Sequence, residues 1–298
     1  MDESAEQWVT VAVGLNEVRA NELALVLIAR GIPHQRQAGA TGLELWVPVD
    51  NAAAAAAELG QYRRENARRV GTRPLDLVGS GLPGVAAYVA VLLVVFVAAR
   101  ESLLGFDWYG AGMSRASAVS AGELWRTVTA LTLHVELAHL SGNLVFGAFF
   151  GWFVGRYLGV GVGWLTVIAS AAVANALSAW LQGPDHRSLG ASTAVFAALG
   201  MLVAYTWRRG FWRATPWRAR VAPIVAGLGL LAFTGTAGEN TDIGAHLLGF
   251  CVGFGGGLVL ARGLTPVWLK NRRLQAGCAV AALVAVVAAW TWGLVSAG

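Results

Sequence analysis

The sequence predicts an all-α membrane bundle with a six-helix core and a seventh C-terminal helix, preceded by a small soluble α+β domain of element order βαββα. Composition is the first observation: 56% of the 298 residues are hydrophobic and only 13% are charged, whereas soluble globular proteins have about 25% charged residues. Charge is also unevenly distributed, since residues 1–75 look ordinary and residues 84–298 are mostly Ala, Val, Leu, Gly, Phe and Trp. Finally, the second region contains apolar stretches near the ~20 residues that a spanning helix needs.

The N-terminal segment predicts a small mixed domain. The expected strands cover residues 8–14, 33–37 and 43–49, and the expected helices cover residues 16–31 and 50–66. Val and Thr favour the first strand, and Gly31 is a typical residue to end the first helix. Asp50 is the expected N-cap of the second helix, which continues through six alanines. With the basic linker 63–73, this domain occupies residues 1–75.

Seven apolar segments are candidates for membrane spans. They cover residues 84–104, 140–159, 160–181, 191–207, 221–237, 243–261 and 275–296. The second and third meet at a tight turn around Gly159, and the fourth follows a polar stretch at 182–187. Residues 84–261 are therefore the expected six-helix core, and residues 275–296 are an additional transmembrane helix.

Loop charge predicts the orientation in the membrane. The loops 207–220 and 262–274 contain Arg and Lys and no acidic residue, whereas the opposite loops contain most of the acidic residues of the membrane region. Because basic loops stay in the cytoplasm, we expect the N-terminal domain to be cytoplasmic and the C-terminus to lie outside. One orientation suits all the loops.

Charge and cysteine content argue against other classes of partner. The net charge is +5, but the basic residues lie in the N-terminal domain or at span ends, which favours contact with membrane lipid over nucleic acid. The two cysteines lack metal-ligand spacing. The segment HVELAH at 134–139 is not a zinc-binding HExxH helix, because its histidines are five residues apart and not four. We therefore predict no metal and no cofactor.

Polar residues inside spans are costly, and the few present here are candidates for function. They are His134, His139, Asn143, Asn175, Ser192 and His246. Any one of them alone is better explained as a packing residue with its hydrogen bonds satisfied. All but Asn175 are expected near the outer face, however, so three separate segments bring polar groups to a similar depth.

The spacing of these residues predicts how they meet. His139 and Asn143 are four residues apart and share one helix face. Small neighbours, including Gly190, leave Ser192 open to close approach. Gly249 and Gly253 follow His246 at small intervals, and such glycines let two membrane helices pack closely.

This set predicts nucleophilic chemistry. A serine hydroxyl needs an adjacent imidazole to take its proton, which suggests Ser192 as nucleophile and His246 as base. His139, the Asn143 amide and the Ser192 N–H could stabilise the oxyanion. A dyad is favoured over a triad because no acid lies within a span near His246, and Asp242 is expected to have a loop role.

The motifs together resemble those of the rhomboid family of intramembrane serine proteases. The matching pieces are Trp125-Arg126, His134 with His139 and Asn143, Gly190-Ala191-Ser192, and Ala245-His246 with Gly249 and Gly253, in the family's order over residues 84–261. The βαββα unit also resembles the cytoplasmic domain of some bacterial members. The resemblance implies a protein of the bacterial inner membrane, with Ser192 and His246 catalytic and His139 and Asn143 in the oxyanion hole.

The resemblance also assigns supporting residues and exposes departures. Trp125 and Arg126 would shape a half-submerged first loop, and Phe196 would stack on the catalytic ring where family members often have Tyr. Thr193 follows the serine where Gly is usual, which could narrow the site. Gly155 lies where many bacterial members have Glu, so the packing there must differ.

The sequence is thus interpreted as an intramembrane serine endopeptidase that cleaves transmembrane protein substrates near the outer membrane face. One alternative is a catalytically silent rhomboid-like protein that binds membrane helices, which would be expected to lack Ser192 or His246. A second is a small transporter, which would be expected to have ionisable residues reaching the inner face, or inverted repeats. Both Ser192 and His246 are present, and the sequence shows neither ionisable residues that reach the inner face nor inverted repeats.

Overall fold

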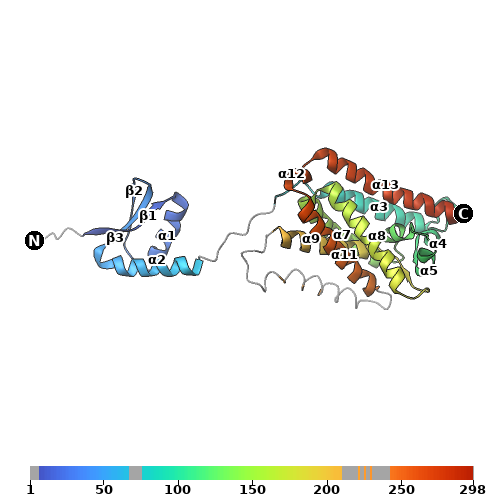
Figure 1. The fold of residues 1–298 in the computed structure, drawn as a ribbon, viewed down its shortest axis with the longest axis horizontal. Helices are drawn as coiled ribbons and strands as arrows, with labels where there is room; N and C mark the ends of the chain where they lie inside the picture. The colour runs from blue at the N-terminus through green and yellow to red at the C-terminus, as the bar shows by residue number, and fades with distance from the viewer. Residues whose placement is uncertain are drawn as a thin grey trace, which may run out of the picture. The chain divides into compact units, whose positions relative to one another are not determined.

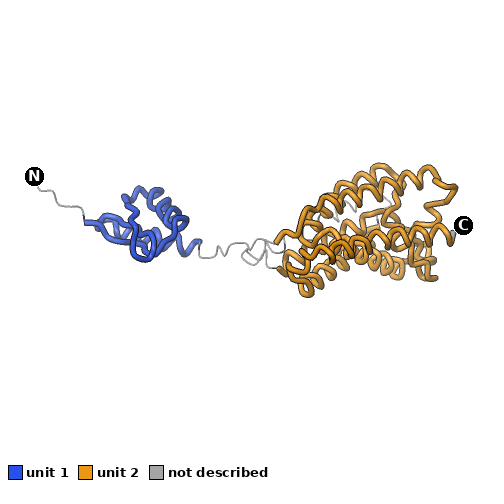
Figure 2. Tube along the Cα trace, turned by 90° about the horizontal axis from the view of Figure 1, so that it is seen from above, with its two compact units in different colours: residues 1–71 blue, residues 72–298 orange. Residues whose placement is uncertain are grey.

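The computed structural model describes residues 7–66, 76–209 and 242–297, together with the isolated positions 221, 225 and 229. The chain divides into two compact units, residues 1–71 and 72–298 (Figure 2). The span expected at 221–237 lies outside the described residues, apart from those three positions.

The N-terminal unit is a three-stranded antiparallel sheet with two helices. Its elements are β1 (Trp8–Leu15), α1 (Glu17–Ala29), β2 (Gln35–Gly39), β3 (Gly42–Pro48) and α2 (Ala52–Asn66), with sheet order β1-β3-β2. The expected small sheet is confirmed, and Leu27 of α1 and Leu45 of β3 are fully buried in the core of the unit. The expectation for Asp50 is wrong. It lies inside a 3-10 turn, Val49–Asn51, that precedes α2 and whose preceding residue, Pro48, makes no side-chain cap.

The second unit is a helical bundle (Figure 1). Its long helices are α3 (Leu82–Arg100), α7 (Leu137–Leu158), α8 (Val160–Leu181), α9 (Ser192–Arg208), α11 (Ile243–Gly263) and α13 (Arg272–Ala297). Among the described residues, five of these, all but α9, are long and apolar enough to cross a membrane. The chain is therefore a multi-pass membrane protein. The shorter α9 has 17 residues, and most of its side chains are buried.

Short elements connect the long helices at one end of the bundle. Between α3 and α7 lie η2 (Leu103–Gly105), α4 (Trp108–Gly112), β4 (Ser114–Arg115), α5 (Ala116–Ser120), α6 (Arg126–Thr129) and η3 (Ala130–Thr132). Strand β5 (Arg187–Ser188) follows α8 and pairs with β4. We call the end that contains β4 and β5, where α3, α8 and α13 finish and α7, α9 and α11 begin, the Ser192 end. At the opposite end, α12 (Pro266–Leu269) connects α11 to α13 (Figure 1).

Helices α9 and α11 are in close backbone contact. A Cβ added at Gly253 would collide with the Ala197 carbonyl, and one added at Gly200 would collide with the Phe250 carbonyl. Glycine on both helices therefore permits the approach that the sequence predicts, in which small residues bring membrane helices together.

The start of α3 packs against the end of α7 in the same manner. A Cβ added at Gly155 would lie 2.7 Å from the Cα of Gly81, and the Val78 N–H donates to the Arg156 carbonyl at 2.8 Å. A larger residue at position 155 would push this segment away. The departure noted at Gly155 thus corresponds to a direct backbone contact.

The start of helix α13 is held against the bundle by the side chain of Gln275. The Gln275 side-chain oxygen accepts from the N–H groups of Gly161 at 2.8 Å and Val162 at 3.1 Å. Its nitrogen donates to the carbonyls of Leu158 and Leu269 at 2.9 and 2.8 Å. Gln275 therefore satisfies backbone groups that the α7–α8 turn leaves without partners inside the helices.

Candidate active site

Ser192 and His246 meet at the Ser192 end of the bundle. Ser192 is the first residue of α9, and His246 lies in the first turn of α11. Their Oγ and Nε2 atoms are 2.6 Å apart and hydrogen-bonded. His246 is buried and Ser192 is half-buried. Because α9 and α11 are in backbone contact, this distance follows from helix packing and not from a flexible loop.

A glycine one turn after His246 explains how closely the two helices approach beside the pair. A Cβ added at Gly249, one turn after His246, would lie 2.5 Å from the carbonyl oxygen of Thr193, the residue after Ser192. Thr193 itself is buried, with its methyl group against the same glycine. The threonine therefore fills space between the two helices beside the pair.

Phe196 covers one face of the histidine. Its ring centroid lies 4.9 Å from that of His246, with an angle of 31° between the planes. Phe196 is one turn after Ser192 on α9, so the same helix supplies the hydroxyl and the aromatic surface that limits rotation of the imidazole.

The second ring nitrogen of His246, Nδ1, is buried and has no hydrogen-bond partner among the described residues. Asp242 instead caps α11 by accepting from the Ala245 N–H at 2.9 Å, and it also contacts His186 at 2.8 Å and Gln182 at 3.2 Å. Burial alone would raise the pKa of Asp242, but these hydrogen bonds and the neighbouring His186 hold that pKa below its usual value. Asp242 thus links the loop before α9 to the start of α11.

A second group of polar residues faces the turn before Ser192. Gly190 has φ +124, a conformation that favours glycine, and a Cβ added there would lie 2.6 Å from Cε1 and 2.8 Å from Nε2 of His139. The Asn143 amide nitrogen would be 3.7 Å away. His139 and Asn143 therefore share the face of α7 that borders the serine turn, as their spacing predicts. His139 is exposed and Asn143 is buried.

His134 joins this group to the serine turn. Its Nε2 accepts from the Ala191 N–H at 3.2 Å and lies 2.9 Å from the Asn143 amide nitrogen. Because a backbone N–H only donates, this Nε2 is unprotonated and the Asn143 nitrogen donates to it as well. Burial, with His139 nearby, lowers the pKa of His134 to about 4, which keeps the ring neutral.

Trp125 and Arg126 shape the segment between α3 and α7. The buried Arg126 guanidinium binds Glu123 at 2.5 Å and donates to the carbonyls of Gly110 and Met113 at 2.8 and 2.9 Å. Trp125 donates its indole N–H to the Ala111 carbonyl at 3.2 Å. Both residues therefore hold α4 in place, and neither contacts Ser192 or His246 through a hydrogen bond among the described residues.

Sequence reasoning missed two residues that support this site. The Trp290 indole of α13 donates to Thr132 Oγ1 at 3.0 Å, and Thr132 donates to the Thr129 carbonyl at 2.8 Å. Thr132 lies two residues before His134. The only signal was a tryptophan in an apolar span, which also suits the membrane interface. The sequence likewise did not predict that His186 pairs with Asp242.

The fold and the site together define a multi-pass membrane protein in which a serine hydroxyl and a histidine imidazole are hydrogen-bonded. Comparison with known proteins then relates part of the chain to one family. Residues 121–263 match the rhomboid domain. Rhomboid-like protease 2 of Toxoplasma gondii is 30% identical over 176 residues, which is 55% of this chain and 58% of that protein. The rhomboid protease GluP of Bacillus subtilis is 31% identical over 185 residues, or 61% of this chain and 34% of the relative.

A third relative, a putative rhomboid protease YdcA of Bacillus subtilis, is 28% identical over 137 residues. The chain spans less than two thirds of the length of the first two relatives. The rhomboid-domain match contains Ser192 and His246 together with His134, His139, Asn143 and Phe196, and it does not reach Trp290. Residues 121–263 of this chain are therefore similar to a rhomboid domain, and the relatives that the chain matches are named as rhomboid proteases.

Proposed function

We propose that this chain is an intramembrane serine endopeptidase in which Ser192 attacks the substrate and His246 acts as the base. The observation that supports it most strongly is the 2.6 Å contact between Ser192 Oγ and His246 Nε2. For this contact to activate the hydroxyl, the imidazole must be neutral, with its proton on Nδ1 and the lone pair of Nε2 facing the hydroxyl.

The proposed reaction has two halves. Ser192 Oγ bonds to the carbonyl carbon of the scissile peptide while its proton passes to His246 Nε2. Collapse of the tetrahedral intermediate breaks the C–N bond, and His246 returns the proton to the leaving amine. Water, deprotonated by His246, then attacks the acyl ester, releases the new carboxyl terminus and restores the Ser192 hydroxyl. The exposed His139 beside the half-buried serine supports access of water from the Ser192 end.

Three donors are proposed for the oxyanion. The Ser192 N–H is the first, because Ser192 begins α9 and the first N–H groups of a helix lack partners within it. Asn143 is the second, since only one of its two amide protons is required by His134. His139, over Gly190, is the third. We expect Asn143→Ala to lower kcat by about 10²–10³.

In this proposal Ser192 and His246 act as a catalytic dyad, without an acidic third residue. The nearest acid on α11, Asp242, is engaged by the helix N-terminus, Gln182 and His186. The stacked ring of Phe196, and not a carboxylate, would hold the imidazole in its plane.

The proposed substrates are single-span membrane proteins with small residues near the boundary on the Ser192 side. A spanning helix uses its carbonyls in its own hydrogen bonds, so residues that weaken the helix would help to expose the scissile bond. We further propose that the Ser192 end faces outward, with the N-terminal unit in the cytoplasm of a bacterial cell and the protein in its inner membrane. The basic loop around Arg262 and Lys270, at the other end of the bundle, supports this orientation.

Cleavage of a reporter with one transmembrane segment, by the purified full chain in detergent or liposomes, tests the proposal. Wild type should cleave, and Ser192→Ala and His246→Ala should each lose at least about a thousandfold in rate. Ser170→Ala, a buried serine of α8 away from the site, is the matched control and should cleave normally, as should wild type with a metal chelator. Cleavage that persists in Ser192→Ala contradicts the proposal. Reporter binding without cleavage by wild type points to the silent alternative.

A further inference from the structure

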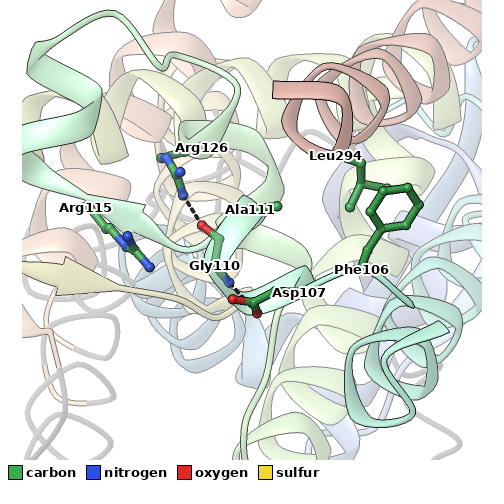
Figure 3. A pocket seen from close by; sticks show the side chains of 7 residues that line it. All are labelled: Phe106, Asp107, Gly110, Ala111, Arg115, Arg126 and Leu294. Atoms are coloured by element: carbon green, nitrogen blue, oxygen red, sulfur yellow. Dashed lines mark hydrogen bonds between the residues drawn. The ribbon is translucent and has the colours of Figure 1, made fainter. Parts of the chain in front are cut away.

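A cavity of about 310 Å³ lies at the Ser192 end of the bundle, apart from the Ser–His pair. It is lined by the segment before α4, by α4 itself, by β4, by the start of α6 and by the end of α13. The lining residues are Phe106, Asp107, Gly110, Ala111, Arg115, Arg126 and Leu294 (Figure 3).

The charged groups of this cavity are not equivalent. Arg126 is occupied by the Glu123 carboxylate and by two carbonyls, and Asp107 accepts from the Gly110 N–H at 2.8 Å. Arg115 has no side-chain hydrogen bond or ion pair within the described ranges, and its Nε is buried. Because a guanidinium has five N–H donors in a planar fork, the cavity presents an uncommitted cationic donor.

The other wall of the cavity is apolar. Figure 3 shows the Phe106 and Leu294 side chains together on the side away from the two arginines. The chain just before Phe106 exposes Leu103 and Leu104, with 51% and 79% of their surfaces accessible. Exposed leucines beside a membrane bundle favour a lipid environment over water, so this loop lies at the membrane boundary.

The depth of the cavity in the membrane agrees with that placement. One lining residue, Leu294, lies in the last turn of α13, which ends at Ala297. Another, Phe106, follows the end of α3 at Arg100 by a few residues. The two helices finish their apolar spans here. A ligand at this depth meets hydrocarbon on one side and headgroups on the other.

We propose that this cavity binds the phosphate headgroup of a membrane glycerophospholipid, with Arg115 donating to the phosphate oxygens and the first acyl carbons against Phe106 and Leu294. The planar fork of arginine matches phosphate geometry. The apolar wall gives a lipid an advantage that a free phosphate ion does not have. Because Arg126 and α4 line the same cavity, the bound lipid would also stabilise the loop that those residues form.

Native mass spectrometry of the purified full chain in detergent, titrated with phosphatidylglycerol, tests this site. Arg115→Gln should weaken binding of the first lipid about tenfold, the usual effect of losing a charged hydrogen bond. Arg187→Gln is the matched control, because Arg187 pairs with Arg115 through the β4–β5 backbone but is exposed and does not line the cavity. Its lipid affinity should equal that of wild type.

Two further arms identify the ligand chemistry. Diacylglycerol, which lacks the phosphate, should bind at least tenfold more weakly, and millimolar inorganic phosphate should not displace the phospholipid. Leu294→Trp, which fills the apolar side and keeps Arg115, should also lose the lipid, and its thermal unfolding shows whether the protein is folded. Equal phosphatidylglycerol binding by wild type and Arg115→Gln overturns the proposal, as does displacement by inorganic phosphate. None of these readouts depends on proteolysis.

Discussion

At Gly249, the lack of a side chain sets the separation of α9 and α11. A Cβ there would lie 2.5 Å from the Thr193 carbonyl oxygen, which is backbone and cannot rotate away. The helices would have to move apart, and the Ser192–His246 contact spans them. A single methyl group is thus enough to disturb the proposed catalytic geometry.

We therefore predict that Gly249→Ala lowers peptidase activity at least tenfold and destabilises the bundle by about 1–3 kcal/mol, the usual cost of overpacking. Gly255→Ala lies on the same helix, where an added Cβ meets no atom within 4 Å, and should leave both unchanged. Reporter cleavage and thermal unfolding of the two variants provide the measurement. Equal activity of the two would show that the close approach at Gly249 is not needed.

His134 predicts a pH dependence of stability. Its pKa is about 4 in the folded protein, because burial and His139 disfavour the charged ring, against about 6.5 for an ordinary histidine. Between these values the unfolded chain binds the proton and the folded chain does not. The stabilising contribution is therefore complete above about pH 6.5 and declines as the pH falls toward 4.

The unfolding temperature of the purified protein should thus fall between pH 6.5 and pH 4, and it should fall less steeply in His134→Gln, which cannot take up the proton. Other titrating groups contribute the same slope to both proteins, so the difference between the two curves isolates His134. Parallel curves would contradict the assignment of a neutral, acceptor Nε2 to this residue.

At the scale of elements, α13 is connected to the site and is not simply appended to the core. Its start is held by Gln275 at the α7–α8 turn. Near its end, the Trp290 N–H reaches Thr132, and the segment that follows supplies His134, which accepts from the Ala191 N–H next to Ser192. A short series of buried contacts therefore connects the seventh helix to the serine turn.

Trp290→Phe keeps an aromatic side chain and removes the indole N–H. We expect it to lower kcat several-fold with KM little changed, and to cost about 1 kcal/mol of stability, the usual worth of one hydrogen bond. Trp180→Phe, an exposed tryptophan at the end of α8, is the control. In a double-mutant cycle that combines Trp290→Phe with Thr132→Val, the effects of the two substitutions on kcat should be non-additive. Additive effects would indicate that Trp290 acts by general packing alone.

For the molecule as a whole, several helices and most of the candidate site residues could be predicted from the sequence alone. The expected span at 160–181 coincides with α8, and that at 243–261 is extended by two residues in α11, because apolar runs and a turn glycine are local signals. The Ser192, His246, His139 and Asn143 positions could be selected because polar residues are rare in spans. The close approach of Ser192 and His246 was predictable from glycine spacing, and the shared face of His139 and Asn143 from their separation of four residues.

Other features depend on partners far apart in the chain, which no local pattern records. Thr132 and Trp290 are separated by 158 positions and Gln275 and Gly161 by 114. No pattern in the sequence singles out Arg115, whose place in the cavity and lack of a side-chain hydrogen bond among the described residues depend on the fold. Asp50 shows the reverse error, since a favourable N-cap residue was overridden by a 3-10 turn after Pro48.

Labelling of the purified full chain with a fluorophosphonate, followed by peptide mapping, is a direct test of whether His246 activates Ser192, because the probe reacts with serines that a base has activated. We predict one modified residue, Ser192, in wild type, and loss of that label in His246→Ala with the unfolding temperature preserved. Label on another serine, or undiminished labelling of Ser192 without the His246 imidazole, would contradict it.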